Sequence, residues 1–531
     1  MFLFVILIIA TPQAWADTDG KTSNGVRFHG GDEVILQGFH WNIVRTAEED
    51  WYKIVKDKAE EIKNDGFTGI WLPVPWRDQS FWNPSRTENI EFGGEGYFWT
   101  DFNKNSRYGD DLELKEAAAE LKGKGVKVIY DIVPNHHNRG HLGDELDLPS
   151  NQGYYRTDCG NCDDGDPFMS GDSDFNTANP RIYNLFKDEF SNLKENYSAS
   201  GFRFDFVRGY APERIDAWMN QTLDEGFCVG ELWKSPQDYP NNDWRHHATW
   251  QDIIKNFSDT SNCSVFDFAL KDRMQNGSIS DWKYGLNGNP DAKWREVAVT
   301  FVDNHDTGYS PGPLGGQHHW PLADQQRKMA YAYILSSPGT PVVYWPHMYD
   351  WGLKDFLKNL IKIRQDLGIK AYSDIKFDNR YSGLVGRTMG SKGELLFALD
   401  SNLSDPRQVV SGPWRELMNE DNGTIRLWEK TLKPEVDVKF SCENGLTQLG
   451  QSVYVVGNNT NLGNWDVTQA IKLNPDTYPT WNNTIKLIAG ETAEWKCIIR
   501  SESNPSQVIK WEQGSNNFVT AALDEVTVGH F

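Results

Sequence analysis

The chain has 531 residues, too many for one compact domain, which predicts two or three domains. Its net charge of −22 argues against a polyanionic partner such as DNA and favours a neutral or cationic substrate. Aromatic residues make up 13% of the chain and include 22 Trp, many near Gly, Asn and Asp, where a ring can stack on a ligand as well as pack in a core.

The first sixteen residues have the pattern of a secretory signal peptide. An apolar run is followed by Pro12 and then by the sequence "AWA" at 14–16, a small-x-small cleavage signature. The apolar run is too short to span a membrane comfortably. We therefore expect a secreted protein whose mature form begins at Asp17 and which has no membrane partner.

Six cysteines fit an oxidising compartment. The first two have CxxC spacing, so zinc binding or redox chemistry is an alternative to a disulfide there. Zinc requires further ligands nearby and a redox motif should open a helix, whereas acidic residues and Gly follow this pair. Pairing of nearest neighbours predicts the disulfides Cys159–Cys162, Cys228–Cys263 and Cys442–Cys497.

Eight short apolar runs alternate with helical segments along the first two thirds of the chain. Alternating strands and helices indicate a parallel sheet, and eight units predict an α/β fold with a (β/α)8 barrel. Expected helices include the Ala-rich segment 112–122 and a segment near 181–196. The expected strands lie within residues 33–41, 67–76, 125–137, 201–210, 226–234, 264–270, 297–306 and 340–348.

The rest of the chain predicts two further β regions. We expect the barrel over residues 17–367, with an excursion over 135–180 that is rich in Gly, Asp and Asn. Alternating segments such as "YSGLVGR" and "GELLFALD" predict a small antiparallel β domain over 368–429, and residues 433–531 have an all-β pattern.

Each of the eight runs becomes polar or functional at its C-terminal end, which is where a (β/α)8 barrel carries its active site. A purely structural barrel has no reason to collect such side chains at one end, so the pattern predicts an enzyme. The residues at these ends are His40, Trp76, Asn135, His136, Asp205, Glu231, His305, Asp306 and His347.

Three of these strand ends carry a carboxylate. Arg203 and Asp205 share one face of the strand "GFRFDFVRGY", and the guanidinium favours an ionised carboxylate that can act as a nucleophile; a structural ion pair is the alternative. Glu231 follows apolar residues in "CVGELW", surroundings that raise a carboxyl pKa and suit a general acid. With Asp306, the set fits glycoside hydrolysis.

Four motifs in order, "DIVPNH", "GFRFDFVR", "GELW" and "FVDNHD", resemble the signature regions of the α-amylase family of glycoside hydrolases. The resemblance implies a retaining reaction with Asp205 as nucleophile, Glu231 as acid/base and Asp306 as transition-state stabiliser. It also implies that the accompanying substrate residues are Arg203, His136 and His305.

Longer stretches such as "GGDEVILQGFHWN", "GGEGYFW" and "SPGTPVVYW" resemble the amylases of pseudomonads that release maltotetraose from non-reducing chain ends. In those enzymes a loop recognises the chain end, and the matching positions are Trp82 and Asp172, with Ser170 where the relatives have Gly. The resemblance places four further residues in the cleft: Trp41, Phe98, Gln317 and Trp320.

The acidic loop "CDDGDPFMSGDSDF" has the hard oxygen ligands and turn-forming Gly that suit Ca²⁺, although solvated acidic loops are common and the spacing is not that of an EF-hand. The resemblance implies two calcium ions. The ligands of the first are Asn135, Asp163, Asp166, Asp174 and the backbone of Gly209. Those of the second are Asp17, His29, Asp32 and Glu33.

The C-terminal residues 433–531 resemble starch-binding domains, through stretches such as "VYVVGNNTNLGNWD" and "VIKWEQGSNN". In one implied site Trp465 and Trp511 stack on glucose rings and Lys496 hydrogen-bonds nearby. A second implied site contains Tyr454, Tyr478 and Trp481, with packing in the small core as the alternative for Tyr454 and Trp481.

Together these features predict a secreted, calcium-dependent, monomeric enzyme that hydrolyses α-1,4-glucosidic bonds of starch and malto-oligosaccharides from the non-reducing end. Two alternatives keep the chemistry and change the outcome: endo-cleavage, or glucanotransferase activity with mixed products. A starch-binding protein without catalysis is the alternative from another class, and all three carboxylates argue against it.

Overall fold

The computed structural model describes residues 26–78, 95–139, 146, 148–160, 165–224, 226–431 and 435–531. The chain forms two compact units, Met1–Phe377 and Asp378–Phe531. The predicted signal peptide and the predicted calcium ligand Asp17 lie outside the described residues. Among the described residues, no helix is both long enough and apolar enough to cross a bilayer.

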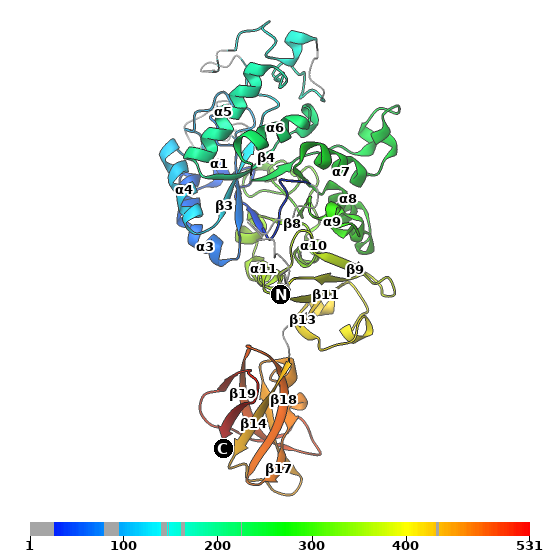
Figure 1. The fold of residues 1–531 in the computed structure, drawn as a ribbon. Helices are drawn as coiled ribbons and strands as arrows, with labels where there is room; N and C mark the ends of the chain where they lie inside the picture. Colours follow the sequence, from blue (N-terminus) through cyan, green and yellow to red (C-terminus); the bar gives the residue numbers. More distant parts are fainter. Residues whose placement is uncertain are drawn as a thin grey trace, which may run out of the picture. The chain divides into compact units, whose positions relative to one another are not determined.

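The first unit contains a closed barrel of eight parallel strands, which confirms the prediction from the eight apolar runs (Figure 1). The strands pair in chain order, and the first closes on the last with Ile35 opposite Val342. The strands are β1 (Ile35–Gln37), β2 (Gly69–Leu72), β3 (Lys127–Ile132), β4 (Ala199–Phe204), β5 (Phe227–Gly230), β6 (Ser264–Phe266), β7 (Ala298–Phe301) and β8 (Thr340–Tyr344).

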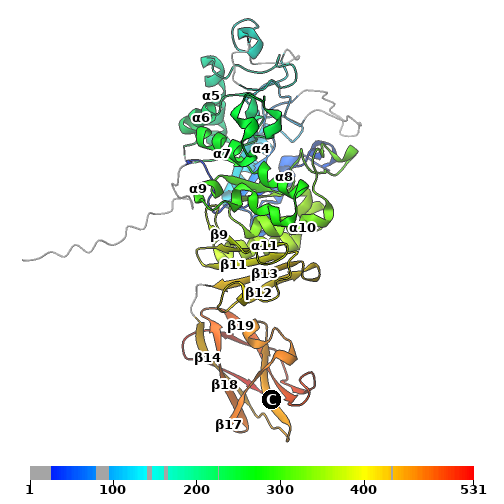
Figure 2. The same cartoon turned by 90° about the vertical axis from the view of Figure 1, so that its right-hand side faces the viewer.

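Helices lie around the outside of the barrel, as Figures 1 and 2 show. Both helices expected near 112–122 and 181–196 are present, and each begins at a residue that caps it: Asp110 accepts a hydrogen bond from the Glu113 amide, and Asn179 from the Arg181 amide. The helices are α1 (Ile43–Thr46), α2 (Trp51–Asp57), α3 (Ala59–Asn64), α4 (Asp111–Gly123), α5 (Pro180–Asn196), α6 (Glu213–Thr222), α7 (Trp250–Ser261), α8 (Phe268–Asn276), α9 (Ala292–Arg295), α10 (Asp324–Ser336) and α11 (Lys354–Leu367).

Successive side chains of β4 point to opposite faces of the strand, one packed against a helix and the other directed into the barrel. Phe202 and Phe204 point outward and pack on Phe190 of α5, with ring centroids 5.0 and 6.0 Å apart. Arg203 lies between them in the sequence and is fully buried on the opposite face of the strand. The apolar face therefore holds the strand against its helix, and the other face delivers a charged side chain to the interior of the barrel.

In the excursion between β3 and α5, an isolated β-bridge joins His136, just after β3, to Asp174, and a second bridge joins Tyr155 to Phe175 within the excursion. Cys159, which ends a short 3₁₀ turn there, takes part in a disulfide, which argues against the zinc and thiol-redox alternatives; its predicted partner Cys162 lies outside the described residues. The predicted disulfide Cys228–Cys263 is confirmed.

The strand β9 (Asp374–Phe377) follows the barrel and lies within the predicted small β domain over 368–429. In the second unit, four antiparallel strands lie in the order β12, β13, β11, β10, which confirms the predicted small β domain. Their bounds are β10 (Leu384–Met389), β11 (Gly393–Leu399), β12 (Arg415–Glu420) and β13 (Ile425–Thr431).

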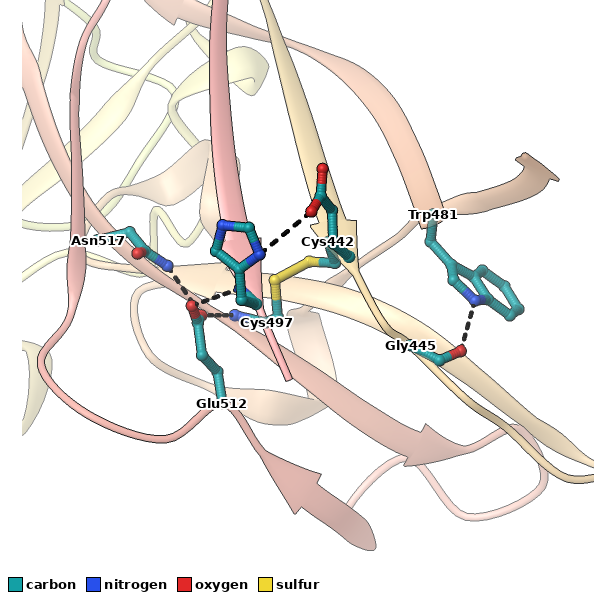
Figure 3. Close-up of a disulfide and its surroundings, with 8 residues drawn as sticks. Cys442, Gly445, Trp481, Cys497, Glu512 and Asn517 are labelled. Atoms are coloured by element: carbon teal, nitrogen blue, oxygen red, sulfur yellow. Dashed lines mark hydrogen bonds and ion pairs between the residues drawn. A yellow bond between two sulfur atoms is a disulfide. The ribbon is translucent and has the colours of Figure 1, made fainter. Parts of the chain in front are cut away.

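The C-terminal part of the second unit consists of two β-sheets around one apolar core. The predicted disulfide Cys442–Cys497 is confirmed and joins β14 of one sheet to β19 of the other (Figure 3). One sheet has the order β17-β18-β14-β22 and the other β16-β15-β19-β20, with β21 also paired to β19. The bounds are β14 (Glu435–Glu443), β15 (Gln451–Gly457), β16 (Ile471–Lys472), β17 (Asn474–Thr477), β18 (Thr480–Ile488), β19 (Thr492–Ser501), β20 (Val508–Trp511), β21 (Asn517–Thr520) and β22 (Glu525–His530).

Candidate active site

A buried arginine joins the carboxyl ends of β3, β4 and β5. Arg203 Nη1 lies 2.9 Å from Asp131 and 2.5 Å from Asp205, and its Nη2 lies 2.6 Å from Glu231. The Arg203 side chain is fully buried, so its charge requires compensation by nearby carboxylates. One guanidinium therefore fixes two of the three predicted catalytic carboxylates beside each other.

The third predicted carboxylate, Asp306, reaches the same cluster through a histidine and a tyrosine. His305 Nε2 lies 3.2 Å from Asp306 Oδ2 and 2.6 Å from the hydroxyl oxygen of Tyr97. That hydroxyl donates to Asp131 at 2.7 Å, and Gln37 contacts the other ring nitrogen of His305 at 2.8 Å. The structure thus gathers Asp205, Glu231 and Asp306 at the carboxyl end of one barrel.

Burial controls protonation in this cluster. Removal from water raises the pKa of Glu231 well above its usual range, and the charges of Asp205 and Asp306 act in the same direction against the opposing charge of Arg203. Burial also raises the pKa of Asp306 to about 7 and that of Asp131 to about 7. A protonated Glu231 at neutral pH is what a general acid requires.

His136 lies at the end of β3 beneath an aromatic side chain of the excursion. Its ring stacks on Phe168 with centroids 3.8 Å apart, and Phe98 contacts both rings at 6.1 and 5.8 Å. Burial lowers the pKa of His136 to about 4, so its imidazole is neutral at neutral pH. The predicted substrate residues Phe98 and His136 therefore lie side by side, whereas Phe168 was not predicted.

Trp41 lies on the other side of the cluster. Its ring is parallel to those of Tyr97 and His305, with centroids 5.8 and 6.2 Å away, and its amide donates to Ser310 at 3.2 Å. The predicted cleft residue Gln317 is half-buried in the segment that follows Ser310. Trp41 is therefore placed directly against the catalytic cluster.

Trp320 belongs to an aromatic stack. It lies parallel to Trp233 and Trp250, with ring centroids 6.3 and 6.2 Å away. The same two tryptophans line a cavity of about 300 Å³ that reaches Glu231, together with Phe206, Arg208, Ser235 and Asp238. Trp233 and Trp250 were not predicted as cleft residues, although Trp233 directly follows the "GEL" of a quoted motif.

The chain-end residues are only partly described. Trp82 lies outside the described residues. Asp172 is exposed, and its carboxylate accepts a hydrogen bond from the Ser170 hydroxyl at 3.0 Å. Its carbonyl accepts a bond from Arg139 at 2.9 Å.

The residues predicted for the first calcium ion bring oxygen donors together in part. The Asn135 side-chain oxygen lies so close to Gly209 that a Cβ on that glycine would be 2.1 Å from it, and the Phe175 amide donates to the Asn135 carbonyl beside Asp174. The Asp166 carboxylate instead binds Lys234 at 2.6 and 2.8 Å. Asn135, Asp174 and Gly209 fit an oxygen-preferring ion; the Asp166 carboxylate does not, and Asp163 lies outside the described residues.

The described residues of the second predicted calcium site do not fit a metal. Both oxygens of the buried Glu33 are occupied, one by Lys127 at 3.0 Å and the other by the Gly31 amide at 2.5 Å. Burial opposes ionisation of Glu33, but these partners outweigh it and lower its pKa. His29 contacts the Gly30 carbonyl, and Asp32 is exposed. In this arrangement Glu33 is the ion-pair partner of Lys127, and its role as a calcium ligand stays a prediction.

In the C-terminal domain, the first predicted sugar site has one exposed ring and one half-buried ring. Trp511 is 38% exposed at the end of β20, whereas Trp465 packs against the core cluster around Tyr454. Lys496 donates to the carbonyls of Glu512, Gly514 and Ser515 at 2.9 to 3.3 Å. The ammonium group therefore holds the turn after Trp511, where a direct bond to sugar was predicted.

The second predicted sugar site is mostly core. Trp481 is 4% exposed and donates its indole N–H to the Gly445 carbonyl (Figure 3). Tyr454 is equally buried, and the Arg500 guanidinium covers its ring at 3.9 Å. Tyr478 is 53% exposed. The packing alternative therefore describes Tyr454 and Trp481, and Tyr478 is the member of this trio whose ring is open.

Sequence reasoning missed the supports behind the catalytic carboxylates. Asp131 is a fully buried carboxylate directly opposite Arg203 in the register of β3 and β4. A charged residue inside "KVIYDI" was the available signal, because a buried Asp requires a cation. Tyr97 and Gln37 carried no comparable signal, since their partner His305 is more than 200 positions away.

The closed parallel barrel with carboxylates gathered at its C-terminal end defines a glycoside hydrolase of the α-amylase class. Two solved structures share this fold. The α-amylase from Geobacillus thermoleovorans has a TM-score of 0.54 and 19% sequence identity, and the match covers 75% of this chain and 98% of that one. The gamma-CGTase from alkalophilic Bacillus clarkii has a TM-score of 0.53 and 16% identity, and the match covers 96% of this chain and 99% of that one.

Family models narrow this class. A model described as "Glucan 1,4-alpha-maltotetraohydrolase, domain C" matches residues 349–412, and one described as "Starch binding domain" matches 435–528. The chain is 57% identical to the glucan 1,4-alpha-maltotetraohydrolase of Stutzerimonas stutzeri, in an alignment that covers 97% of this chain and 96% of the relative. It is 56% identical to that of Roseateles saccharophilus, over 98% of this chain and 97% of the relative. The chain belongs to the glucan 1,4-alpha-maltotetraohydrolase family.

Proposed function

We propose that this enzyme hydrolyses α-1,4-glucosidic bonds of starch and malto-oligosaccharides with retention of configuration, and that it releases maltotetraose from non-reducing ends. The observation that carries the proposal is the contact of one buried guanidinium with both Asp205 and Glu231. This contact holds a nucleophile and an acid/base beside one glycosidic bond.

In the first step the Asp205 carboxylate attacks the anomeric carbon, and Glu231 gives its proton to the departing glycosidic oxygen. The raised pKa of Glu231 favours the protonated form that this step requires. In the second step the ionised Glu231 takes a proton from water, which attacks the same carbon and releases Asp205. Asp306, beside His305, stabilises the positively charged transition state and hydrogen-bonds the sugar ring.

Exo-action requires that the enzyme recognise a chain end. The exposed carboxylate of Asp172 is suited to accept hydrogen bonds from the hydroxyls of a terminal glucose, and Trp82 is its proposed partner in this role. The open ring of Trp511 serves binding to starch granules. Export as a secreted protein rests on the pattern of residues 1–16, and N-terminal sequencing of the exported protein tests cleavage before Asp17.

One calcium ion is proposed at Asn135, Asp174 and the Gly209 carbonyl, with Asp163 as a further ligand. Its role there is structural, because it ties the excursion to the ends of β3 and β4. An ion that binds only the folded state stabilises that state. We therefore expect chelation to lower the melting temperature and added Ca²⁺ to restore it. An unchanged melting temperature after prolonged chelation and dialysis would contradict the site.

Replacement of the acid/base tests the chemistry. We expect Glu231→Gln to lower kcat on maltoheptaose by about 10²–10⁴-fold, the usual contribution of general acid–base catalysis, while adsorption to starch granules persists. The exposed Glu213→Gln is the matched control and should keep full activity. Near-normal activity of Glu231→Gln would overturn the assignment, and an early product ladder of mixed lengths from the unmodified enzyme would overturn exo-action.

A further inference from the structure

We propose that Arg139 is a positioning residue for chain-end recognition: it fixes the backbone at Asp172, so that the carboxylate is presented in one place to the terminal glucose. This inference rests on the proposed role of Asp172 and deepens it. Arg139 lies just after β3, far in the sequence from the loop it holds, and none of the sequence motifs singled it out.

Arg139 makes four contacts that join three segments. Its Nη1 donates to the Asp172 carbonyl at 2.9 Å, and its Nη2 donates to Ser150 Oγ at 2.6 Å. The same Nη2 lies 3.7 Å from the carboxylate of Asp158. The guanidinium plane also lies 3.7 Å from the centre of the Tyr155 ring. Both terminal nitrogens and one face of the guanidinium therefore make contacts.

The platform under Arg139 is rigid. Tyr155 is fully buried, and its ring lies nearly parallel to those of His137 and Phe175, with its centroid 5.6 Å from each. Those two rings also stack on each other at 4.6 Å, and the Tyr155 hydroxyl bonds the His137 ring at 2.9 Å. The neighbouring Arg156 amide donates to the Asp174 carbonyl at 2.9 Å. The guanidinium thus connects the exposed loop at Asp172 to this buried group of aromatic rings.

The loop is also tied to the residues after β3 directly beyond Asp172, where the His137 amide donates to the Ser173 carbonyl at 3.3 Å and His136 forms a β-bridge with Asp174. Residues 168–174 form tight turns, in which the Gly171 amide donates to the Phe168 carbonyl and Gly171 has a φ of +77°. Asp172 is exposed, and its carboxylate accepts a hydrogen bond from Ser170, two residues away on the same loop. The bond from Ser170 orients the carboxylate relative to the loop, and Arg139 adds a side-chain contact at Asp172 itself to the backbone bonds that tie Ser173 and Asp174 to the barrel.

Lysine cannot make this set of contacts. Its single ammonium group lacks the planar fork that reaches two acceptors while stacking on a ring. We therefore expect Arg139→Lys to weaken the clamp and Arg139→Gln to abolish it. Arg181 is a matched control, because it also lies over a tyrosine of this region, Tyr154 at 5.8 Å, and is exposed.

The test compares two maltoheptaosides, one with a free non-reducing end and one whose non-reducing end is blocked by an acetal. The measured quantity is the ratio of kcat/KM on the blocked substrate to that on the free one, together with the maltotetraose share of early products. We expect Arg139→Gln to raise the ratio about tenfold, the effect of losing one charged hydrogen bond, and Arg139→Lys to raise it less. Arg181→Gln should leave it unchanged.

Asp172→Asn separates this inference from the proposed function. If Asp172→Asn raises the ratio and Arg139→Gln does not, the positioning role of Arg139 is wrong and the role of Asp172 stands. If Asp172→Asn itself leaves the ratio unchanged, chain-end recognition by Asp172 fails, and the inference fails with it. An equal rise in Arg181→Gln would show general loosening of the excursion and would also overturn the inference.

Discussion

The end of the barrel and the starch-binding domain differ in the chemistry that they present to sugars. In the barrel, charged groups converge on the fully buried Arg203, and each has a defined partner. In the starch-binding domain, the rings are divided between an exposed Trp511 and a buried Trp481. A buried charge must be paired, so its position specifies its partners, whereas an aromatic ring gains from leaving water in a core or against a sugar.

The largest expected effect is at the centre of the charged cluster. Arg203→Lys keeps the positive charge but loses the fork that touches Asp131, Asp205 and Glu231 together. Because small misplacements of reacting groups are costly, we expect kcat on maltoheptaose to fall about 10²-fold or more. Arg295→Lys is the control, since Arg295 is equally buried and pairs with Asp374. Similar losses in both variants would show that buried arginines support folding alone.

The same contrast explains what the sequence could predict. Backbone periodicity places polar residues at the ends of parallel strands on one rim, so Asp205, Glu231 and Asp306 were recognisable before their contacts were known. Local sequence does not encode partners that tertiary folding supplies, such as Tyr97 for His305. For that reason the cluster was predictable, and the hydrogen-bond network that holds it was not.

For the aromatic residues of the starch-binding domain, the sequence could not distinguish buried rings from exposed ones. Trp481 and Trp511 both lie in short β-patterned stretches, and nothing in their spacing distinguishes core from surface. Lys496 was expected to hydrogen-bond sugar because of the resemblance to starch-binding domains, but its ammonium group donates to three backbone carbonyls. The calcium ligands were likewise implied by resemblance, and Lys234 binds the Asp166 carboxylate.

One substitution at two positions sharpens this contrast. Trp481→Ala removes a buried ring and its bond to Gly445, and we expect it to destabilise the starch-binding domain by about 3–5 kcal/mol. Trp511→Ala removes an exposed ring, and we expect adsorption to starch granules to weaken about tenfold with little change in stability. Calorimetry of the full chain and granule adsorption isotherms measure the two effects. The reverse outcome would show that Trp481 is the binding ring.

The smallest expected effect is the pH dependence of stability that Glu231 gives to the barrel. Because burial raises the pKa of Glu231, the folded protein binds this proton more tightly than the unfolded chain does. The resulting stability is fully present below the ordinary pKa of a glutamic acid and is lost as pH rises through the raised value. Glutamine cannot ionise, so Glu231→Gln avoids this loss.

We therefore expect the melting temperature of Glu231→Gln to exceed that of the unmodified enzyme by an amount that grows as pH rises above neutrality. The difference between the two proteins cancels the titration of residues outside this cluster and reports on Glu231 together with its coupled neighbours Asp131 and Asp306. In the starch-binding domain, hydrogen bonds from Thr468 to Asp466 and from Lys472 to Glu502 lower the pKa values of these carboxyls further below neutrality. A constant difference from pH 6 to pH 9 would mean that Glu231 is ionised throughout, which would contradict its role as the resting general acid.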